Sequence, residues 1–225
     1  LADGWPQYRG DAARSGYTGQ QLPDRLVEDW VYSSSQAPDP AWQGVDTRMP
    51  FDHAFQPVAD HGSVYFGSSA DCRVYSLDSG TGEQRWSFTT GAPVRFAPAL
   101  WKGRVFVVSD DGWLYCLSAV NGSVVWKEQG GPDGQMILGN DRMVSRWPAR
   151  GGAVVDRDVV YFAAGIWPTD GVYIKALDAA SGREVWSNST SGSIEMDKPH
   201  PGARAKSGVA AQGYLAVGGE KLIVP

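Results

Sequence analysis

Leu77-Asp78-Ser79-Gly80-Thr81-Gly82-Glu83-Gln84-Arg85-Trp86 is a stretch that this chain repeats, from Leu117 to Trp126 and again from Leu177 to Trp186. Each copy has an aliphatic residue, then Asp or Ser, then Gly five positions after the aliphatic residue and Trp four after the Gly. The short polar residue can accept hydrogen bonds from turn amides, and the glycine can take a left-handed backbone that β-branched residues disfavour. The frame therefore predicts a β-hairpin whose second strand carries a Trp. Its repeat residues are Asp78, Asp178, Gly82, Gly122 and Gly182.

The spacing of these copies predicts the architecture. Trp86 and Trp126 are 40 residues apart and Trp126 and Trp186 are 60 apart, with the additional 20 almost wholly in Gln129–Arg150. Four short strands in about 40 residues are typical of a propeller blade. We therefore expect an all-β fold, a β-propeller of four-stranded antiparallel blades. The expected blades span about 55–88, 94–127 and 152–186, and a partial blade spans 208–225.

Residues 1–50 are expected to form an entry segment. Its Leu26–Tyr32 stretch looks like the Trp-bearing strand of a repeat, without earlier strands before it. A propeller needs such a strand when the last blade is completed by the N-terminus. We therefore predict a closing strand near 26–32, and we predict that four tryptophans are buried between blades: Trp30, Trp86, Trp126 and Trp186.

Composition excludes some classes of partner. The net charge of −5 and pI near 5.2 argue against a nucleic-acid partner, which favours basic faces. No apolar run approaches the ~20 residues of a membrane-spanning helix. Because the sequence begins at Leu1, an upstream segment such as a signal peptide is compatible with it.

The Leu-Asp-x-x-x-Gly-x-x-x-Trp frame resembles the tryptophan-docking repeat of pyrroloquinoline quinone (PQQ)-type propellers. This superfamily includes quinoprotein alcohol and glucose dehydrogenases and the propeller lipoprotein of bacterial outer-membrane assembly. The opening Trp5-Pro6-Gln7-Tyr8-Arg9-Gly10 is similar to the N-terminal signature of non-enzymatic PQQ-like bacterial proteins. The resemblance implies a ring of seven or eight blades, of which this chain holds about three and a half, with the remaining blades as its partners. It also implies a periplasmic or otherwise extracytoplasmic location.

The long connections between strands are expected on one rim, because the first and third strands of a blade run in the same direction. The longest contains Arg142, Arg146, Trp147 and Arg150, which could clamp an anionic or sugar-like ligand. The alternative is a loop that packs on the rim, with its arginines paired to acidic residues. Those acids are expected to be Asp110, Asp111 and Asp170. Further ligand-binding candidates are Trp167, Asp111, Arg95 and His53.

Two functions stay open. The first is a non-catalytic propeller that binds a protein, peptide or glycan on this rim, without cofactor or metal. The alternative is a PQQ- and calcium-dependent quinoprotein oxidoreductase acting on alcohols or sugars. Resemblance to those dehydrogenases implies a vicinal Cys-Cys disulfide over the cofactor, whereas this chain has only Cys72 and Cys116, which are far apart. Their calcium ligands and catalytic Asp also have no residue-by-residue match, so we favour the non-catalytic function. A Cys72–Cys116 disulfide stays open.

Overall fold

The computed structural model describes residues 4–41, 52–139, 141–196 and 205–225. The first blade contains β1 (Val58–Asp60), β2 (Ser63–Ser68), β3 (Arg73–Asp78) and β4 (Gln84–Thr89). The second contains β5 (Ala99–Trp101), β6 (Arg104–Val108), β7 (Trp113–Ser118) and β8 (Val124–Gln129). The third contains β11 (Gly151–Asp156), β12 (Val159–Ala164), β13 (Tyr173–Asp178) and β14 (Glu184–Asn188). The third sheet also contains β17 (Gly213–Tyr214). Outside these sheets lie β9 (Met136–Gly139), β10 (Arg142–Ser145), β15 (Ile194–Met196), β16 (Ala205–Ser207), β18 (Ala216–Gly218) and β19 (Lys221–Ile223).

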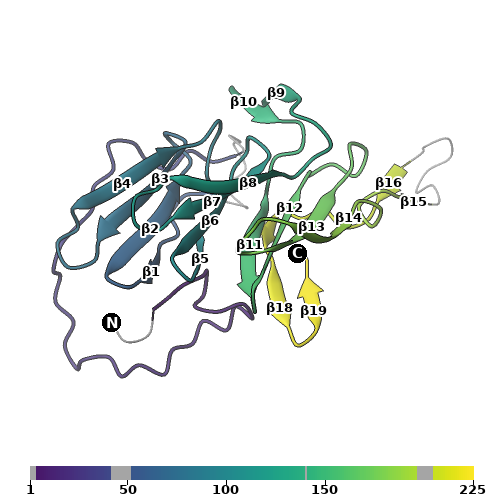
Figure 1. Ribbon diagram of the computed structural model, residues 1–225. Helices are drawn as coiled ribbons and strands as arrows, with labels where there is room; N and C mark the ends of the chain where they lie inside the picture. Colours follow the sequence, from purple (N-terminus) through teal and green to yellow (C-terminus); the bar gives the residue numbers. More distant parts are fainter. Residues whose placement is uncertain (1–3, 42–51, 140, 197–204) are drawn as a thin grey trace.

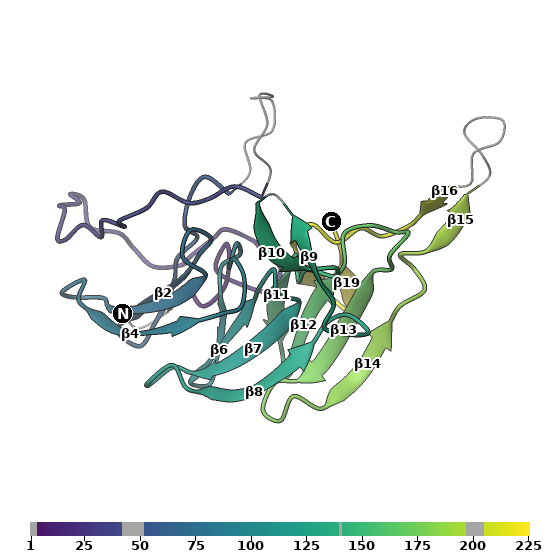
Figure 2. The ribbon, with the colours of Figure 1, turned by 90° about the horizontal axis from the view of Figure 1, so that it is seen from above.

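Each of the three sheets contains a four-stranded antiparallel meander in sequence order, as expected for propeller blades. They fan out side by side, with β4, β8 and β14 along the outer edge (Figures 1 and 2). The apolar core lies between neighbouring blades, where Phe106 of β6 packs with Phe162 of β12. The parallel strand β17 extends the third sheet beside β11, and the β18–β19 hairpin follows it. The all-β partial propeller is confirmed.

The repeated turn has the same hydrogen bonds in all three copies. In the first copy the amide of Gly82 donates to the Asp78 carbonyl at 2.9 Å and the amide of Asp78 donates to the Glu83 carbonyl at 2.8 Å. Gly82 has a φ of 74°, and a Cβ there would lie 2.7 Å from the Trp30 ring. Gly122 and Gly182 meet the rings of Trp86 and Trp126 in the same way. Glycine is therefore required by the backbone and also by the Trp of the preceding repeat.

The predicted burial of the four tryptophans is only partly correct. Trp86 is 8% exposed, while Trp30 and Trp126 are half-buried. The prediction is wrong for Trp186, which is 40% exposed because no repeat turn from the described residues covers it. The closing strand near 26–32 stays a prediction, since these residues have no hydrogen-bonded neighbour strand in the described part of the protein and the partner strands were expected from the remaining blades. Trp30 nevertheless docks, and its indole N–H donates to the Ser79 carbonyl at 3.0 Å.

Two of the expected rim loops contain hairpins instead. The connection between the second and third blades forms β9 and β10, which pair antiparallel and stand above the sheets (Figure 1). The connection after the third blade contains the β15–β16 hairpin. We call the rim that carries β9 and β10 the hairpin rim.

The N-terminal signature forms a strap across the opposite rim, which we call the strap rim. Trp5 exchanges two backbone hydrogen bonds with Ala59 of the first blade, at 2.7 and 2.9 Å. The carbonyl of Pro6 accepts from the Leu100 amide of the second blade at 2.8 Å. The buried Gln7 side chain bonds both backbone groups of Val155 in the third blade, at 2.8 and 2.9 Å. Three consecutive residues thus hold the innermost strands of three consecutive blades.

Arg14 continues this strap toward the last part of the sequence. Its guanidinium donates to the carbonyls of Leu215, Tyr8 and Ala153 at 2.8 to 3.0 Å. Burial lowers the pKa of Arg14 to about 10. Tyr8 stacks on Tyr214, with ring centroids 3.6 Å apart. In the described residues, no helix has the length and apolar character needed to cross a membrane.

Candidate ligand-binding site on the hairpin rim

A buried ion-pair network lies at the centre of the hairpin rim. Asp110 is 1% exposed and accepts hydrogen bonds from two arginines. Arg150 donates through Nε and Nη2, both at 2.9 Å, and Arg95 donates through Nε at 2.6 Å. Arg95 also reaches Asp52 at 3.2 Å and the carbonyl of Asp39 at 2.7 Å through Nη1. The carboxylate therefore holds two guanidinium groups in fixed positions.

Three connections bring these residues together. Arg95 lies between β4 and β5, Asp110 lies between β6 and β7, and Arg150 directly precedes β11. Burial alone would lower the pKa of Arg150, but the Asp110 carboxylate outweighs it, and the net pKa shift is upward. Arg150 therefore stays charged in a site largely removed from water.

The other predicted arginines are paired as well. Arg146 donates to Asp170 through Nε and Nη2, at 3.1 and 2.6 Å. Arg142 is paired with Asp39 at 2.8 Å. Trp147 is 5% exposed, and its indole N–H donates to the Asp170 carbonyl at 2.6 Å. The structure therefore shows the paired arrangement, with Asp110, Asp170 and Asp39 as partners, and Trp147 is a packing residue of this rim.

A cavity of about 90 Å³ lies between the β9–β10 hairpin and this network. Three of its lining residues are Arg95, Arg146 and Arg150. The others are neutral, and most are apolar: Ala41, Ile137, Gly139, Val144, Ser145, Pro148, Ile166 and Trp167. Among the described residues, no carboxylate lines it. The cavity thus offers guanidinium N–H donors beside apolar walls.

Four of the sequence candidates do not line this cavity: Arg142, Trp147, Asp111 and His53. Asp111 is buried and accepts from the amides of Gly91 and Trp113 and from the Tyr115 hydroxyl. Burial, followed by that carboxylate, raises the pKa of Tyr115. His53 is exposed and does not line the cavity. The structure therefore gathers Arg95, Arg146, Arg150 and Trp167 from the predicted set, with Trp147 packed beside them.

Several residues of the site were not predicted. The apolar wall of Ile137, Val144 and Ile166 had only a weak signal, the apolar alternation within the insertion. The contact of Asp52 with Arg95 had no signal in the sequence, because the two residues are 43 positions apart. Asp110 was interpreted as a turn former or pairing residue, and the structure shows it as the buried centre of the network.

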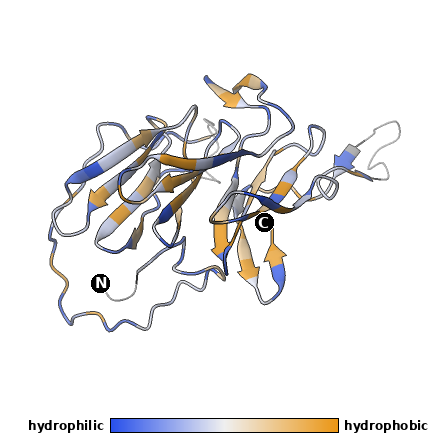
Figure 3. Cartoon of the chain, in the orientation of Figure 1, coloured by the Kyte–Doolittle hydropathy of each residue, from blue (hydrophilic) through white to orange (hydrophobic). Residues whose placement is uncertain are grey.

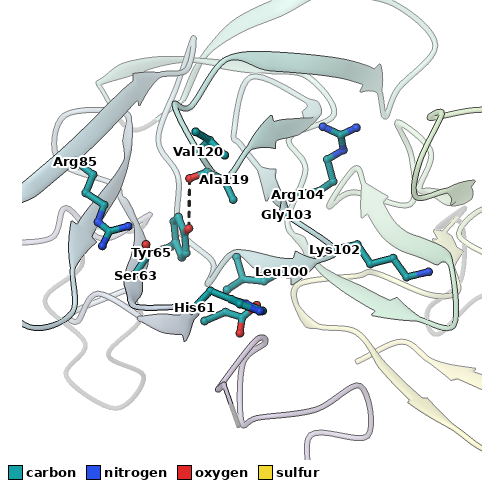
Figure 4. Close-up of a pocket in the computed structure, with 11 residues that line it drawn as sticks. His61, Ser63, Tyr65, Arg85, Leu100, Lys102, Gly103, Arg104, Ala119 and Val120 are labelled. Atoms are coloured by element: carbon teal, nitrogen blue, oxygen red, sulfur yellow. Dashed lines mark hydrogen bonds and ion pairs between the residues drawn. The ribbon is translucent and has the colours of Figure 1, made fainter. Parts of the chain in front are cut away.

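A larger cavity of about 470 Å³ lies on the strap rim between the first two blades (Figure 4). Asp60 and Ser63 of the first blade are part of its lining. The equivalent positions of the second blade hold Trp101 and Arg104. The charged side chains of Arg85, Lys102 and Arg104 extend from its edges in different directions (Figure 4). This cavity therefore has no convergent set of charged groups among the residues described, and we place the candidate site on the hairpin rim.

The described residues do not fit a PQQ and calcium site. Cys72 and Cys116 are both free thiols, which answers the open question of a disulfide. Burial raises the pKa of the Cys116 thiol to about 12. Trp147 is packed rather than open for stacking. The cavity of about 90 Å³ is also far below the ~300–1,000 Å³ of small-molecule pockets.

Comparisons with known proteins connect this fold to PQQ-type propellers. The quinohemoprotein alcohol dehydrogenase of Comamonas testosteroni is 30% identical over 202 residues, 81% of this chain but 25% of that protein. Its crystal structure superposes with a TM-score of 0.60 at 23% identity, covering 89% of this chain and 28% of that one. A europium-containing methanol dehydrogenase also gives a TM-score of 0.60, at 17% identity, covering 84% of this chain and 32% of that one. These two structural matches show the fold alone.

The chain spans about a quarter of the length of the curated relative that it matches. A family model described as outer membrane protein assembly factor BamB matches residues 28–172, more than half of the sequence. These residues include the first two repeat turns and the whole β9–β10 connection. The chain therefore belongs to the PQQ-like propeller repeat family described as outer membrane protein assembly factor BamB.

Proposed function

We propose that this chain is part of a non-catalytic, extracytoplasmic β-propeller that binds a protein or peptide on its hairpin rim. The observation that carries this proposal is the set of exposed apolar side chains on the β9–β10 hairpin, which has hydrophobic colours in Figure 3. Leu138 is 73% exposed and Met143 is 54% exposed, with Met136 and Ile137 beside them. Clustered exposed apolar side chains mark interaction sites, and Met adapts its shape to a partner.

The size of the adjoining cavity supports a macromolecular partner. Its volume of about 90 Å³ suits one inserted side chain rather than a whole cofactor or sugar chain. The hairpin has two strands, so both of its edges have unpaired backbone groups in the described residues. An extended peptide can pair with such an edge while one side chain enters a neighbouring pocket. A glycan fits less well, since Trp167 is the one exposed aromatic residue in this lining, counted over the described residues.

The family description supports the partner class and the location. The matching model is described as an outer membrane protein assembly factor, which fits a protein partner and a periplasmic location. The proposed partners include the remaining blades of the same propeller, and neither PQQ nor a metal is required. The second candidate is a PQQ- and calcium-dependent alcohol dehydrogenase. The 30% identity with the Comamonas enzyme is the observation that favours it.

Peptide selection tests the leading proposal. Random peptides displayed on phage are selected on the immobilised protein and then measured by fluorescence anisotropy. We expect the selected peptides to bind a Leu138→Ser/Met143→Ser variant about tenfold more weakly. The matched control is Val120→Ser, which removes an exposed aliphatic side chain from the strap rim and should leave binding unchanged. Equal loss in both variants, or enrichment of no peptide, contradicts the proposal.

Calorimetric titration with PQQ and calcium tests the alternative. We expect no saturable binding at micromolar concentration and no reduction of a dye with alcohols or sugars. Arg146→Ala is the informative variant, because Trp147→Ala would also disturb packing. Saturable one-to-one binding that Arg146→Ala abolishes would make the oxidoreductase the leading function.

A further inference from the structure

We propose that the cavity on the hairpin rim recognises a carboxylate, carried by a peptide whose neighbouring side chains are apolar. This inference rests on the proposed function, because it names the chemistry of the peptide that the rim binds. The carboxylate is that of an acidic residue or of the peptide's own C-terminus. Nothing in the repeat pattern requires such a pocket, since it is built from the inserted hairpin and three connections.

The charged groups in the cavity wall are all positive among the described residues. Arg95, Arg146 and Arg150 line it, and no carboxylate of the described residues does. The paired acids Asp110 and Asp170 are absent from the lining, so they contact the guanidinium groups without occupying the cavity. A guanidinium has five N–H donors, and Arg146 already uses Nε and Nη2 for Asp170 and Nη1 for Gln135. In the described residues, Nη2 of Arg95 has no acceptor.

Asp110 is a positioning residue for this site. It is 1% exposed and holds Arg95 and Arg150 at the same time. Arginines fixed in this way lose little conformational entropy when a ligand binds. A carboxylate accepts from such planar groups in a bidentate geometry, whereas a neutral amide has one acceptor oxygen and would place two further donors against the arginines.

The apolar wall defines the rest of the ligand. Ile137 and Val144 come from the hairpin, while Ile166 and Trp167 come from the β12–β13 connection. They share the cavity with the buried side chains of Arg95 and Arg150, where little access of water strengthens a charged hydrogen bond. They also provide contacts for aliphatic residues on either side of the acid. The expected ligand is therefore an acidic group within an apolar stretch, rather than a run of acidic residues.

Matched peptides test this inference by fluorescence anisotropy. The probes are labelled octapeptides of mixed Leu, Met, Ile and Ser with one fixed central residue. One pool has Glu and an amidated C-terminus, one has Gln and an amidated C-terminus, and one has Gln and a free C-terminus. We expect a carboxylate-containing pool to bind about tenfold more tightly than the Gln amide, with an advantage that shrinks as salt is raised. The pool that gains affinity identifies the source of the carboxylate.

Two arginine variants provide the control. Arg146→Gln should remove most of the advantage of the carboxylate pools. Arg157→Gln should retain it, because Arg157 is likewise an arginine paired to an Asp, at 3.0 Å, but lies in the β11–β12 turn away from the cavity. Both variants change the net charge equally, and circular dichroism melting checks that both stay folded.

The outcomes separate this inference from the proposed function. Equal binding of the Glu and Gln pools, with loss in the Leu138→Ser/Met143→Ser variant, overturns the carboxylate inference and leaves peptide binding intact. Binding by none of the pools overturns both. Binding of an oligouronate that depends on Arg146, without peptide binding, overturns the choice of a peptide as the carrier.

Discussion

The tryptophans of the repeat act across blades, each on the turn of the next repeat. Trp86 lies against Gly122 and its indole N–H donates to the Ala119 carbonyl at 3.0 Å. Replacing a buried aromatic residue by Ala typically costs about 3–5 kcal/mol. We expect Trp86→Ala to lose stability of this order and Trp186→Ala to lose much less, because Trp186 is 40% exposed. Denaturant unfolding of both variants measures the difference, and equal losses would contradict the assigned docking.

Asp110 is expected to be the most sensitive charged residue of the rim. Removing one partner of a buried ion pair costs about 3–5 kcal/mol, because the remaining charge is left uncompensated. Asp110→Ala would leave both Arg95 and Arg150 without this carboxylate. The control is Asp158→Ala, which breaks an exposed pair with Lys102 and should cost less than about 1 kcal/mol. Thermal melts of the two variants compare these costs, and similar melting temperatures would show that the network does not stabilise the fold.

At the scale of the element, the repeated turn provides a pH-dependent contribution to stability. The hydrogen bond from Arg85, followed by those from the amides of Gly80 and Thr81, lowers the pKa of Asp78 from its ordinary value of 3.8 to about 2. A carboxyl group with a lowered folded-state pKa stabilises the fold above its unfolded pKa, and this contribution is lost as the pH falls through the folded pKa.

We therefore expect part of the acid destabilisation between about pH 4 and pH 2 to disappear in Asp78→Asn. Asn keeps the acceptor oxygen of the turn but does not titrate. Chemical unfolding at several pH values measures this change. The second repeat has Ser118 at the equivalent position, so Ser118→Ala should leave the pH dependence of the free energy of unfolding unchanged. An Asp78→Asn variant with the original pH dependence would contradict the contribution assigned to Asp78.

The hairpins show what the sequence could predict and what it could not. The repeated frame located all three blades, because each turn is specified within ten residues. The extra 20 residues after Trp126 located the insertion, but β9 and β10 have exposed apolar residues that give no clear buried face. The arginines of the site were identified from their clustering. The ion pair of Asp52 with Arg95 was not, because this contact arises only when distant connections meet.

At the scale of the whole molecule, the third blade has an open outer side. Val185 is 53% exposed and Trp186 is 40% exposed, and the equivalent face of the first blade is covered by the second. Exposed apolar faces at the end of a repeat array promote association. We expect the isolated protein to self-associate as its concentration rises, and Val185→Lys/Trp186→Lys to reduce this. Sedimentation velocity measures it, with Val120→Lys as the control. A monodisperse, cooperatively melting monomer would contradict the expectation.

The N-terminal strap has a consequence for the order in which the molecule is completed. The backbone of Trp5 and Pro6 and the side chain of Gln7 bind Ala59, Leu100 and Val155, respectively. This early segment therefore cannot complete its contacts until Val155, 148 positions after Gln7, has been synthesised. The earliest part of the described sequence is then the last to become protected. Protection of the Val155 amide, which donates to Gln7, from hydrogen exchange would report that the strap has docked on the third blade.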